Sequence, residues 1–298
     1  MTSIKDVDIP TYDGLKLRGT LYSVGEQKPC IIMSSGFSGL RSHFIPDFAA
    51  RFGAAGYGVL SYDNRCWGDS EGLPREEVDP WLQTRDYFDA FNYAAAQPEI
   101  DATKIVYWGS SMSGGNAICA AAINKNIAGV ILQVPFVSGE SIARTPGMST
   151  NMLVSDRGKT VAEGSRTRLP NFPSSIEELR SGTSKAVLKD PGAIGFTEEM
   201  QRRGLDWGRV CTAQSLLYTV LHEPMAYIHR ISPTPMLMIV SDSDVTTQTH
   251  VQLEAFAKAL QPKKLKILKG AGHFDPYFGD TFEEGVEAQI EFLKDILG

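Results

Sequence analysis

Short apolar runs alternate with longer amphipathic segments along most of this chain, and no other feature restricts its fold as strongly. Runs that are rich in β-branched residues and bounded by turn residues fit strands buried on both faces of a sheet. The expected strands are Cys30–Ser34, Val59–Asp63, Ile105–Trp108, Gly129–Val134, Met236–Ser241 and Leu265–Leu268.

The segments between these runs carry a helical pattern. The expected helices are Ile45–Ala55, Trp81–Gln97, Gly114–Asn124, Thr249–Ala259 and Phe282–Leu297. In the last of them, apolar residues recur at helical spacing from Phe282 through Val286 and Ile290 to Leu297. Strands that alternate with helices predict an α/β fold with a doubly wound, mostly parallel sheet.

Two segments depart from this alternation. At the N-terminus, Val7–Tyr12 and Leu15–Tyr22 fit the arms of a hairpin around an Asp-Gly turn. From Val137 to His229 the composition shifts towards Ser, Gly, Arg and Pro, without comparable strand-like runs. Because a bare loop of this length would be uncommon, we expect a largely helical cap at 137–229. The sheet domain would then comprise residues 1–136 and 230–298.

The composition argues against several classes of partner. The formal net charge is -6, and no Lys/Arg cluster provides a nucleic-acid footprint. Cys30, Cys66, Cys119 and Cys211 are scattered singly, without the spacing of a disulfide framework or a zinc site. The polar N-terminus lacks the apolar core of a signal peptide, and no run approaches the length of a membrane helix. We therefore expect a cytoplasmic protein with no metal, no cofactor and no nucleic-acid or membrane partner.

The segment from Ile105 to Ala122 carries the sharpest sign of chemistry. An apolar strand leads into Gly-Ser-Ser-Met-Ser-Gly-Gly and then into an Ala-rich helical stretch. This pattern is typical of a nucleophile elbow, in which a serine lies on a sharp strand-to-helix turn with its hydroxyl exposed. The start of the helix also places backbone N–H groups beside that serine, which favours developing negative charge.

Three serines compete for the role of nucleophile. In the pattern G-x-S-x-G, Gly109 selects Ser111 and leaves Ser113 at the position of the second glycine. Choosing Ser113 would satisfy Gly115 but lose the first glycine. Because serine is a small departure from glycine, we prefer Ser111 to Ser113 and Ser110.

A serine nucleophile needs a base and an acid that orients the base. His273 follows an apolar strand in Gly-Ala-Gly-His-Phe-Asp, where the glycines let the ring turn inward, and the other four histidines lack this setting. Asp244 also follows an apolar strand, with Asp242 as its rival. The chain order Ser, Asp, His is the one expected on a sheet of this kind. The sequence thus predicts Ser111, Asp244 and His273 as catalytic residues.

Acyl transfer also needs backbone donors for the oxygen of a tetrahedral intermediate. The N–H of Met112, directly after the expected nucleophile, is one candidate. The loop Ser35–Gly39, which follows the first core strand, is expected to supply the second donor, and we select Phe37 within it.

These motifs resemble those of the α/β-hydrolase superfamily. The segments that carry the resemblance are Gly36–Gly39, Tyr62–Arg65, Gly68–Gly72, Gly109–Gly115, Asp244 and Gly272-His273. Within the superfamily the chain is similar to the dienelactone-hydrolase-like branch. Gln133–Phe136 and Gly272–Asp275 bring it closer still to the fungal polyketide-transferase group, which implies a secondary-metabolite acyl substrate. Members usually carry His-Gly at the oxyanion loop, where this chain has Ser35-Gly36, and a glycine where it has Ser113.

Two further groups of residues have an expected role. Asp63, Arg65 and Asp69 are expected to form a structural network of ion pairs and turns rather than to act in catalysis. An apolar acyl pocket is expected to be lined by aromatic side chains, among them Trp67, Trp207, Trp81 and Phe37.

The predicted chemistry is covalent acyl transfer from an ester or thioester. His273 would take the proton of Ser111 as the hydroxyl attacks, while Asp244 fixes the imidazole. Water as the acceptor makes an esterase or thioesterase, and an alcohol or amine makes an acyltransferase. C–C bond cleavage and a non-catalytic ligand-binding protein stay open as alternatives. The expected partner is a small-molecule acyl substrate, and a homodimer also stays open.

Overall fold

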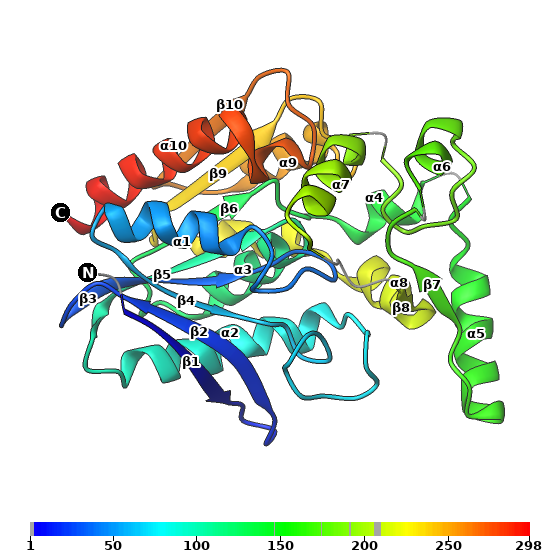
Figure 1. The fold of residues 1–298 in the computed structure, drawn as a ribbon, viewed down its shortest axis with the longest axis horizontal. Helices are drawn as coiled ribbons and strands as arrows, with labels where there is room; N and C mark the ends of the chain where they lie inside the picture. Colours follow the sequence, from blue (N-terminus) through cyan, green and yellow to red (C-terminus); the bar gives the residue numbers. More distant parts are fainter. Residues whose placement is uncertain (1–2, 146, 174, 191, 206–209) are drawn as a thin grey trace.

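A mixed sheet of eight strands forms the centre of the protein in this computed structural model (Figure 1). The structure describes residues 3–145, 147–173, 175–190, 192–205 and 210–298. The strands occur in the order β1-β2-β4-β3-β5-β6-β9-β10. Their bounds are β1 Ser3–Pro10, β2 Lys16–Ser23, β3 Lys28–Ser34, β4 Gly58–Tyr62, β5 Ile100–Ser110, β6 Gly129–Gln133, β9 Met236–Ser241 and β10 Lys263–Leu268.

Strand direction divides the sheet into two parts. The hairpin β1–β2 is antiparallel, and β2 also pairs antiparallel with β4. All pairs from β4 to β10 are parallel. The predicted α/β class with a mostly parallel, doubly wound sheet is therefore confirmed. Because the parallel strands share one direction, the loops that follow β3, β5 and β9 meet at one edge of the sheet.

Helices cover both faces of the sheet (Figure 1). Their bounds are α1 Ile45–Ala54, α2 Pro80–Ala95, α3 Met112–Ile123, α9 Thr249–Lys258 and α10 Gly279–Leu297. One apolar cluster joins α1 and α10 to the sheet, and the other joins α2, α3 and α9 to the opposite face. Within β5, Val106 and Trp108 enter the first cluster, whereas Ile105 and Tyr107 enter the second. This alternation follows from the two-residue period of a strand.

The start of α3 differs from the prediction. The helix begins at Met112 instead of Gly114, so two glycines lie inside its first turns. A Cβ added to Gly114 would lie 2.8 Å from Pro135 Cβ, and one added to Gly115 would lie 2.5 Å from the Phe136 carbonyl oxygen. The glycines therefore allow the helix to pack against the segment that follows β6, and they do not mark its beginning.

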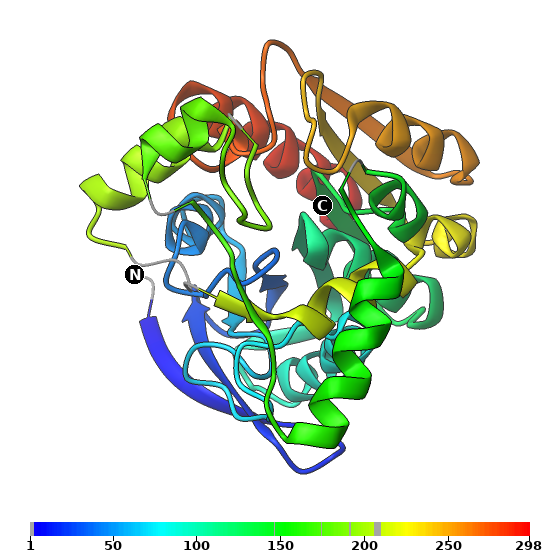
Figure 2. The same ribbon diagram turned by 90° about the vertical axis from the view of Figure 1, so that its right-hand side faces the viewer.

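The segment from residue 139 to residue 221, called the cap below, lies at the end of the sheet opposite the C-terminus (Figure 1) and faces the viewer in Figure 2. Its elements are α4 Gly139–Ala143, α5 Thr150–Glu163, β7 Arg168–Pro170, α6 Ile176–Ser181, α7 Ala193–Arg202, β8 Val210–Thr212 and α8 Ala213–Leu221. The antiparallel pair β7–β8 was not predicted, because strands this short leave no periodic pattern.

The cap is not isolated from the sheet domain. Phe196 of α7 lies 4.9 Å from Phe44 and 4.9 Å from Phe274, measured between ring centroids. The 3-10 helices η1 Pro224–Ala226 and η2 Ile228–Ile231 connect the cap to β9, and η3 Asp275–Tyr277 precedes α10. The domain boundaries proposed at residues 136 and 230 stay a prediction.

Candidate active site

Ser111 occupies a sharp turn between β5 and α3. Its backbone angles are φ 54 and ψ -122, a conformation that costs free energy for a residue with a Cβ. The turn is held from the next strand: Ser111 N donates to the Gln133 carbonyl at 2.9 Å, and Phe136 N donates to the Ser111 carbonyl at 2.8 Å. A Cβ on Gly109 would lie 2.1 Å from the Ser113 carbonyl oxygen, so only glycine fits there. This is the geometry of a nucleophile elbow.

Three side chains from distant parts of the chain form one hydrogen-bonded relay. Ser111 Oγ lies 2.9 Å from His273 Nε2, and His273 Nδ1 lies 2.8 Å from Asp244 Oδ2. Ser111 is 8% exposed, His273 2% and Asp244 3%, so all three residues of the relay are buried. The structure thus brings together all three residues that the sequence singled out. Their catalytic roles are a prediction that this geometry supports.

The surroundings of Asp244 favour its charged form. Burial alone would raise the pKa of this carboxyl group, but the charge of His273 and hydrogen bonds from His273 and Thr247 lower it overall. Gln252 Nε2 donates a further hydrogen bond to Oδ2 at 3.0 Å. Asp244 is therefore held as a carboxylate that can orient the imidazole.

Thr247 and Gln252 were missed by the sequence analysis. Both are buried and both contact the carboxylate of Asp244. Thr247 Oγ1 also lies 3.2 Å from His273 Nδ1. The only local signal was the position of these polar residues soon after Asp244, which does not distinguish them from the neighbouring Thr246 and Thr249.

The rival residues have other partners. Asp242 is exposed and accepts hydrogen bonds from Gly270 N and Ser243 Oγ. Ser110 Oγ lies 2.5 Å from the hydroxyl of Tyr277. Ser113 Oγ donates to the carbonyl oxygen of Ser35, away from the imidazole. These contacts favour Ser111 and Asp244 over their rivals on geometric grounds.

The loop after β3 lies directly against the nucleophile. A Cβ added to Gly36 would lie 2.8 Å from Ser111 Cβ and 3.4 Å from Ser111 Oγ, so the backbone can approach this closely only at glycine. Phe37 and Met112, the expected oxyanion donors, both line the same cavity as Ser111. Met112 is the first residue of α3, and the first N–H groups of a helix have no partner within it.

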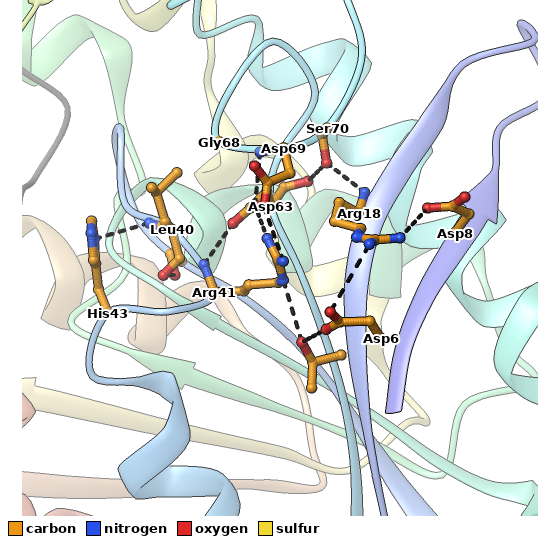
Figure 3. A network of polar contacts seen from close by, with 12 residues as sticks. Asp6, Asp8, Arg18, Leu40, Arg41, His43, Asp63, Gly68, Asp69 and Ser70 are labelled. Atoms are coloured by element: carbon orange, nitrogen blue, oxygen red, sulfur yellow. Dashed lines mark hydrogen bonds and ion pairs between the residues drawn. The ribbon is translucent and has the colours of Figure 1, made fainter. Parts of the chain in front are cut away.

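Arg41, which follows the loop after β3, binds the Asp63–Gly72 segment (Figure 3). Its guanidinium pairs with Asp63 and, at 3.1 Å, with Asp69, while its backbone N–H donates to Asp63 Oδ1 at 2.8 Å. Ser70 Oγ donates to the Asp63 carbonyl at 2.6 Å.

The expected ion-pair network is present, but one expected member belongs elsewhere. Arg65 contacts neither Asp63 nor Asp69 and instead pairs with the buried Asp86 and with Asp13 at 2.7 Å. This choice of partner depends on tertiary packing, because Asp86 lies on α2 and Asp13 in the turn between β1 and β2, whereas Asp63 is paired with Arg41.

An apolar cavity of about 1110 Å³ opens beside Ser111. It extends between the edge of the sheet and the cap. Its apolar lining includes Phe37, Phe136, Ile142, Leu153, Leu169 and Leu216. Its charged lining residues are Asp156, Lys159, Lys185 and Lys189. A cavity of this size and lining suits an apolar ligand longer than a short acyl group.

Among the described residues, Trp67 and Trp81 are not part of the cavity lining. Trp67 is buried behind it, packed with Phe37 and Met112, and its Nε1 donates to the Glu77 carbonyl at 2.9 Å. Trp81 lies with its ring 5.4 Å from that of His222, outside the cavity lining. Trp207 lies outside the described residues. Phe37 is the expected aromatic residue that lines the cavity.

Within the described residues, no group of three or more His, Cys, Asp or Glu side chains could hold a metal ion. The four cysteines are free and buried. No helix of the described chain combines the length and the apolar character needed to cross a membrane.

The fold and the site together define a class of protein. A mostly parallel sheet with a serine at a strand-to-helix turn, beside a histidine and an aspartate from later strands, is that of the α/β hydrolases. The model of the family described as serine aminopeptidase S33, Hydrolase_4, matches residues 25–274, and this chain belongs to that family. It is an enzyme of the serine-hydrolase type, whose chemistry is acyl transfer or hydrolysis of an acyl bond.

Individual relatives match along nearly the whole chain. The thiohydrolase aneE of Aspergillus aculeatus is 33% identical over 98% of this chain and 93% of its own length. The polyketide transferase grgF of a Penicillium species is 31% identical over 97% of this chain and 95% of its own length. The crystal structure of the α/β hydrolase GrgF from Penicillium sp. sh18 has a TM-score of 0.85 at 30% identity and covers 99% of both chains. The resemblance to the α/β hydrolases and to fungal polyketide transferases is therefore confirmed.

Proposed function

We propose that this enzyme hydrolyses an acyl thioester, with Ser111 as nucleophile, His273 as general base and Asp244 as the acid that orients it. The observation that carries the proposal is the hydrogen-bonded relay, with 2.9 Å between Ser111 Oγ and His273 Nε2 and 2.8 Å between His273 Nδ1 and Asp244 Oδ2, beside a mostly apolar cavity that Ser111 lines. A relay of this kind activates a hydroxyl for attack on a carbonyl. The cavity offers room for the acyl chain.

The proposed reaction has two halves. Ser111 Oγ attacks the carbonyl carbon while His273 Nε2 takes its proton, and the tetrahedral intermediate places its negative oxygen near the backbone N–H groups of Phe37 and Met112. Collapse breaks the bond to the thiolate, which receives the proton from His273. Water then attacks the acylated serine with His273 as base, which releases the carboxylic acid and restores the hydroxyl.

Thioesters are favoured over oxygen esters by the names of two relatives. The relative from Aspergillus aculeatus is called a thiohydrolase, and the same term is used for a relative from Eupenicillium brefeldianum that is 30% identical. For this chain we therefore propose a small-molecule acyl thioester, in keeping with the secondary-metabolite acyl groups that its family resemblance implies.

Transfer of the acyl group to an alcohol or amine is the second candidate. Relatives named polyketide transferases support it. Water and an organic acceptor would use the same relay. Only the second half of the reaction differs.

A cytoplasmic location is proposed on separate grounds. Four free, buried cysteines are typical of a protein that stays in a reducing compartment.

Labelling with a fluorophosphonate probe tests the nucleophile. The wild-type enzyme should label, Ser111→Ala should not, and Ser113→Ala should still label because its hydroxyl points away from His273. On octanoyl-N-acetylcysteamine, Ser111→Ala should lose roughly 10⁴-fold or more of kcat. Equal labelling of wild type and Ser111→Ala would contradict the assignment.

Product analysis separates hydrolysis from transfer. The thioester is incubated with the enzyme alone and with added 1-butanol or butylamine. Free octanoic acid formed at the same rate in every mixture supports the thioesterase proposal. If the enzyme forms an ester or amide when the acceptor is present and no free acid when the acceptor is absent, the transferase replaces the thioesterase as the proposed function.

A further inference from the structure

The two positions at which this chain departs from the usual motifs of its family are in direct contact. Ser113, which replaces the second glycine of the elbow, donates a hydrogen bond from its hydroxyl to the carbonyl oxygen of Ser35. Ser35 itself stands where related sequences usually carry histidine. The departures lie far apart in the sequence but form one structural unit.

Two further buried side chains complete this unit. Asn64 Nδ2 donates to the same Ser35 carbonyl at 3.1 Å, and Asn64 Oδ1 accepts a hydrogen bond from Ser34 Oγ at 2.9 Å. Ser34 Oγ also lies 3.1 Å from Ser113 Oγ. Ser34 and Ser113 are 0% exposed and Asn64 is 3% exposed, so water cannot replace these contacts easily.

The held carbonyl belongs to the peptide that leads into the oxyanion loop. Gly36 follows it, with its Cα pressed against Ser111, and Phe37 comes next as the expected donor. The other end of the loop is closed by Ser35 Oγ, which donates to the Leu40 carbonyl at 3.0 Å. Fixing the Ser35 carbonyl therefore fixes the peptide plane from which the loop rises over the nucleophile.

We propose that Ser113 is a positioning residue, which fixes the oxyanion loop Ser35–Phe37 above Ser111. This inference rests on the acyl-transfer function proposed above. Without the hydroxyl, Asn64 alone would hold the Ser35 carbonyl, and the loop would gain freedom to rotate away from the developing negative oxygen. Donors that are preorganised for this oxygen contribute strongly to catalysis, so a small displacement lowers the rate of the chemical step.

The test compares Ser113→Ala with Ser110→Ala. Both changes remove one buried hydroxyl next to the nucleophile, but Ser110 bonds Tyr277 and not the oxyanion loop. We expect Ser113→Ala to lower kcat on octanoyl-N-acetylcysteamine by roughly tenfold with KM nearly unchanged. Ser110→Ala should stay within about twofold of the wild type, since only its stability is expected to suffer.

A transition-state analogue separates loop positioning from a general structural effect. Octylboronic acid bonds through boron to Ser111 Oγ, the serine proton passes to His273, and the negative boronate places a hydroxyl at the oxyanion position. Octanamide binds the cavity without this bond. Ser113→Ala should weaken the binding of octylboronic acid by about the same factor by which it lowers kcat/KM. The binding of octanamide should stay within about twofold of that of the wild type.

Ser113→Gly serves as a second variant if Ser113→Ala does not fold, and thermal unfolding checks both. Activity of either folded variant within about twofold of the wild type would overturn the inference. An equal loss of affinity for octylboronic acid and octanamide would also overturn it. Failure of the wild type to label with the fluorophosphonate would instead reject the proposed function, which keeps the two failures distinct.

Discussion

Thr247 binds both oxygens of the Asp244 carboxylate. Its backbone N–H donates to Oδ1 at 2.9 Å, and its hydroxyl donates to Oδ2 at 2.7 Å. The same hydroxyl lies within 3.2 Å of His273 Nδ1 and of the Val134 carbonyl. Thr247 therefore links the acid and the base of the relay to the end of β6, the strand that also holds the backbone of Ser111.

We expect Thr247→Val to lower kcat by roughly tenfold, because the carboxylate loses a hydrogen bond that holds it in line with the imidazole. Thr246→Val is a matched control: Thr246 lines the same cavity, but its hydroxyl donates to Asp190 at 2.9 Å. Steady-state kinetics on one thioester compare the two. Similar losses in both variants would show that Thr247 acts through cavity shape alone.

The buried environment of His222 predicts that the folded protein loses stability in mild acid. The ring is fully buried, stacked on Phe136, and within the described chain neither ring nitrogen has a hydrogen-bond partner. Burial lowers the pKa of His222 to about 3. In the unfolded chain the imidazole of His222 would bind a proton near pH 6.5, whereas in the folded protein it stays neutral at that pH. The free energy of unfolding therefore decreases as the pH falls below about 6.5.

Replacing the ring removes this dependence. Between pH 7.5 and pH 5 the wild type should lose about 2 kcal/mol of unfolding free energy through His222, and His222→Phe should not. Urea unfolding at the two pH values measures the difference, which is independent of any packing cost of phenylalanine. His250→Phe, at an exposed position, should keep the wild-type pH dependence. The same dependence in His222→Phe would assign the acid sensitivity to another group.

The three lysines that line the cavity suggest a further prediction: the enzyme should prefer acyl donors that carry a negative charge. Lys159, Lys185 and Lys189 line the cavity against one carboxylate, that of Asp156, and no salt bridge to these lysines occurs within the described chain. Lys185→Gln/Lys189→Gln should raise KM several-fold for a thioester of a dicarboxylic acid and leave the octanoyl thioester unchanged. Lys264→Gln, remote from the cavity, is the control. Equal effects on the two thioesters would contradict a role of charge.

Much of the fold could be predicted from local patterns. The buried strands around Ile105 and Met236 are short apolar runs between turn residues, and the helix that ends at Leu297 keeps a strict apolar stripe. Such patterns depend on neighbours within a few residues, which the sequence states directly. The β7–β8 pair left no such pattern, because three-residue strands gain their stability from the tertiary contacts around them.

The candidate site also contains residues that could be predicted from the sequence and residues that could not. Ser111, Asp244 and His273 could be selected because each follows a strand of one parallel sheet, whose loops must meet at a common edge. Thr247 could not be distinguished from Thr246, since two adjacent threonines offer the same chemistry until the direction of each side chain is known. Arg65 was assigned to the wrong carboxylate for the same reason.

By itself, then, the sequence determined the class of fold, the order of its strands along the chain and the three polar residues at their ends. The serine that faces the imidazole, the arginine that pairs with Asp63 and the contact between Ser113 and Ser35 became known from the three-dimensional arrangement. These contacts depend on strand pairing across the sheet: β3 pairs with β4 and β5, and β5 is joined through β6 and β9 to β10, which places residues distant in the chain within hydrogen-bond distance.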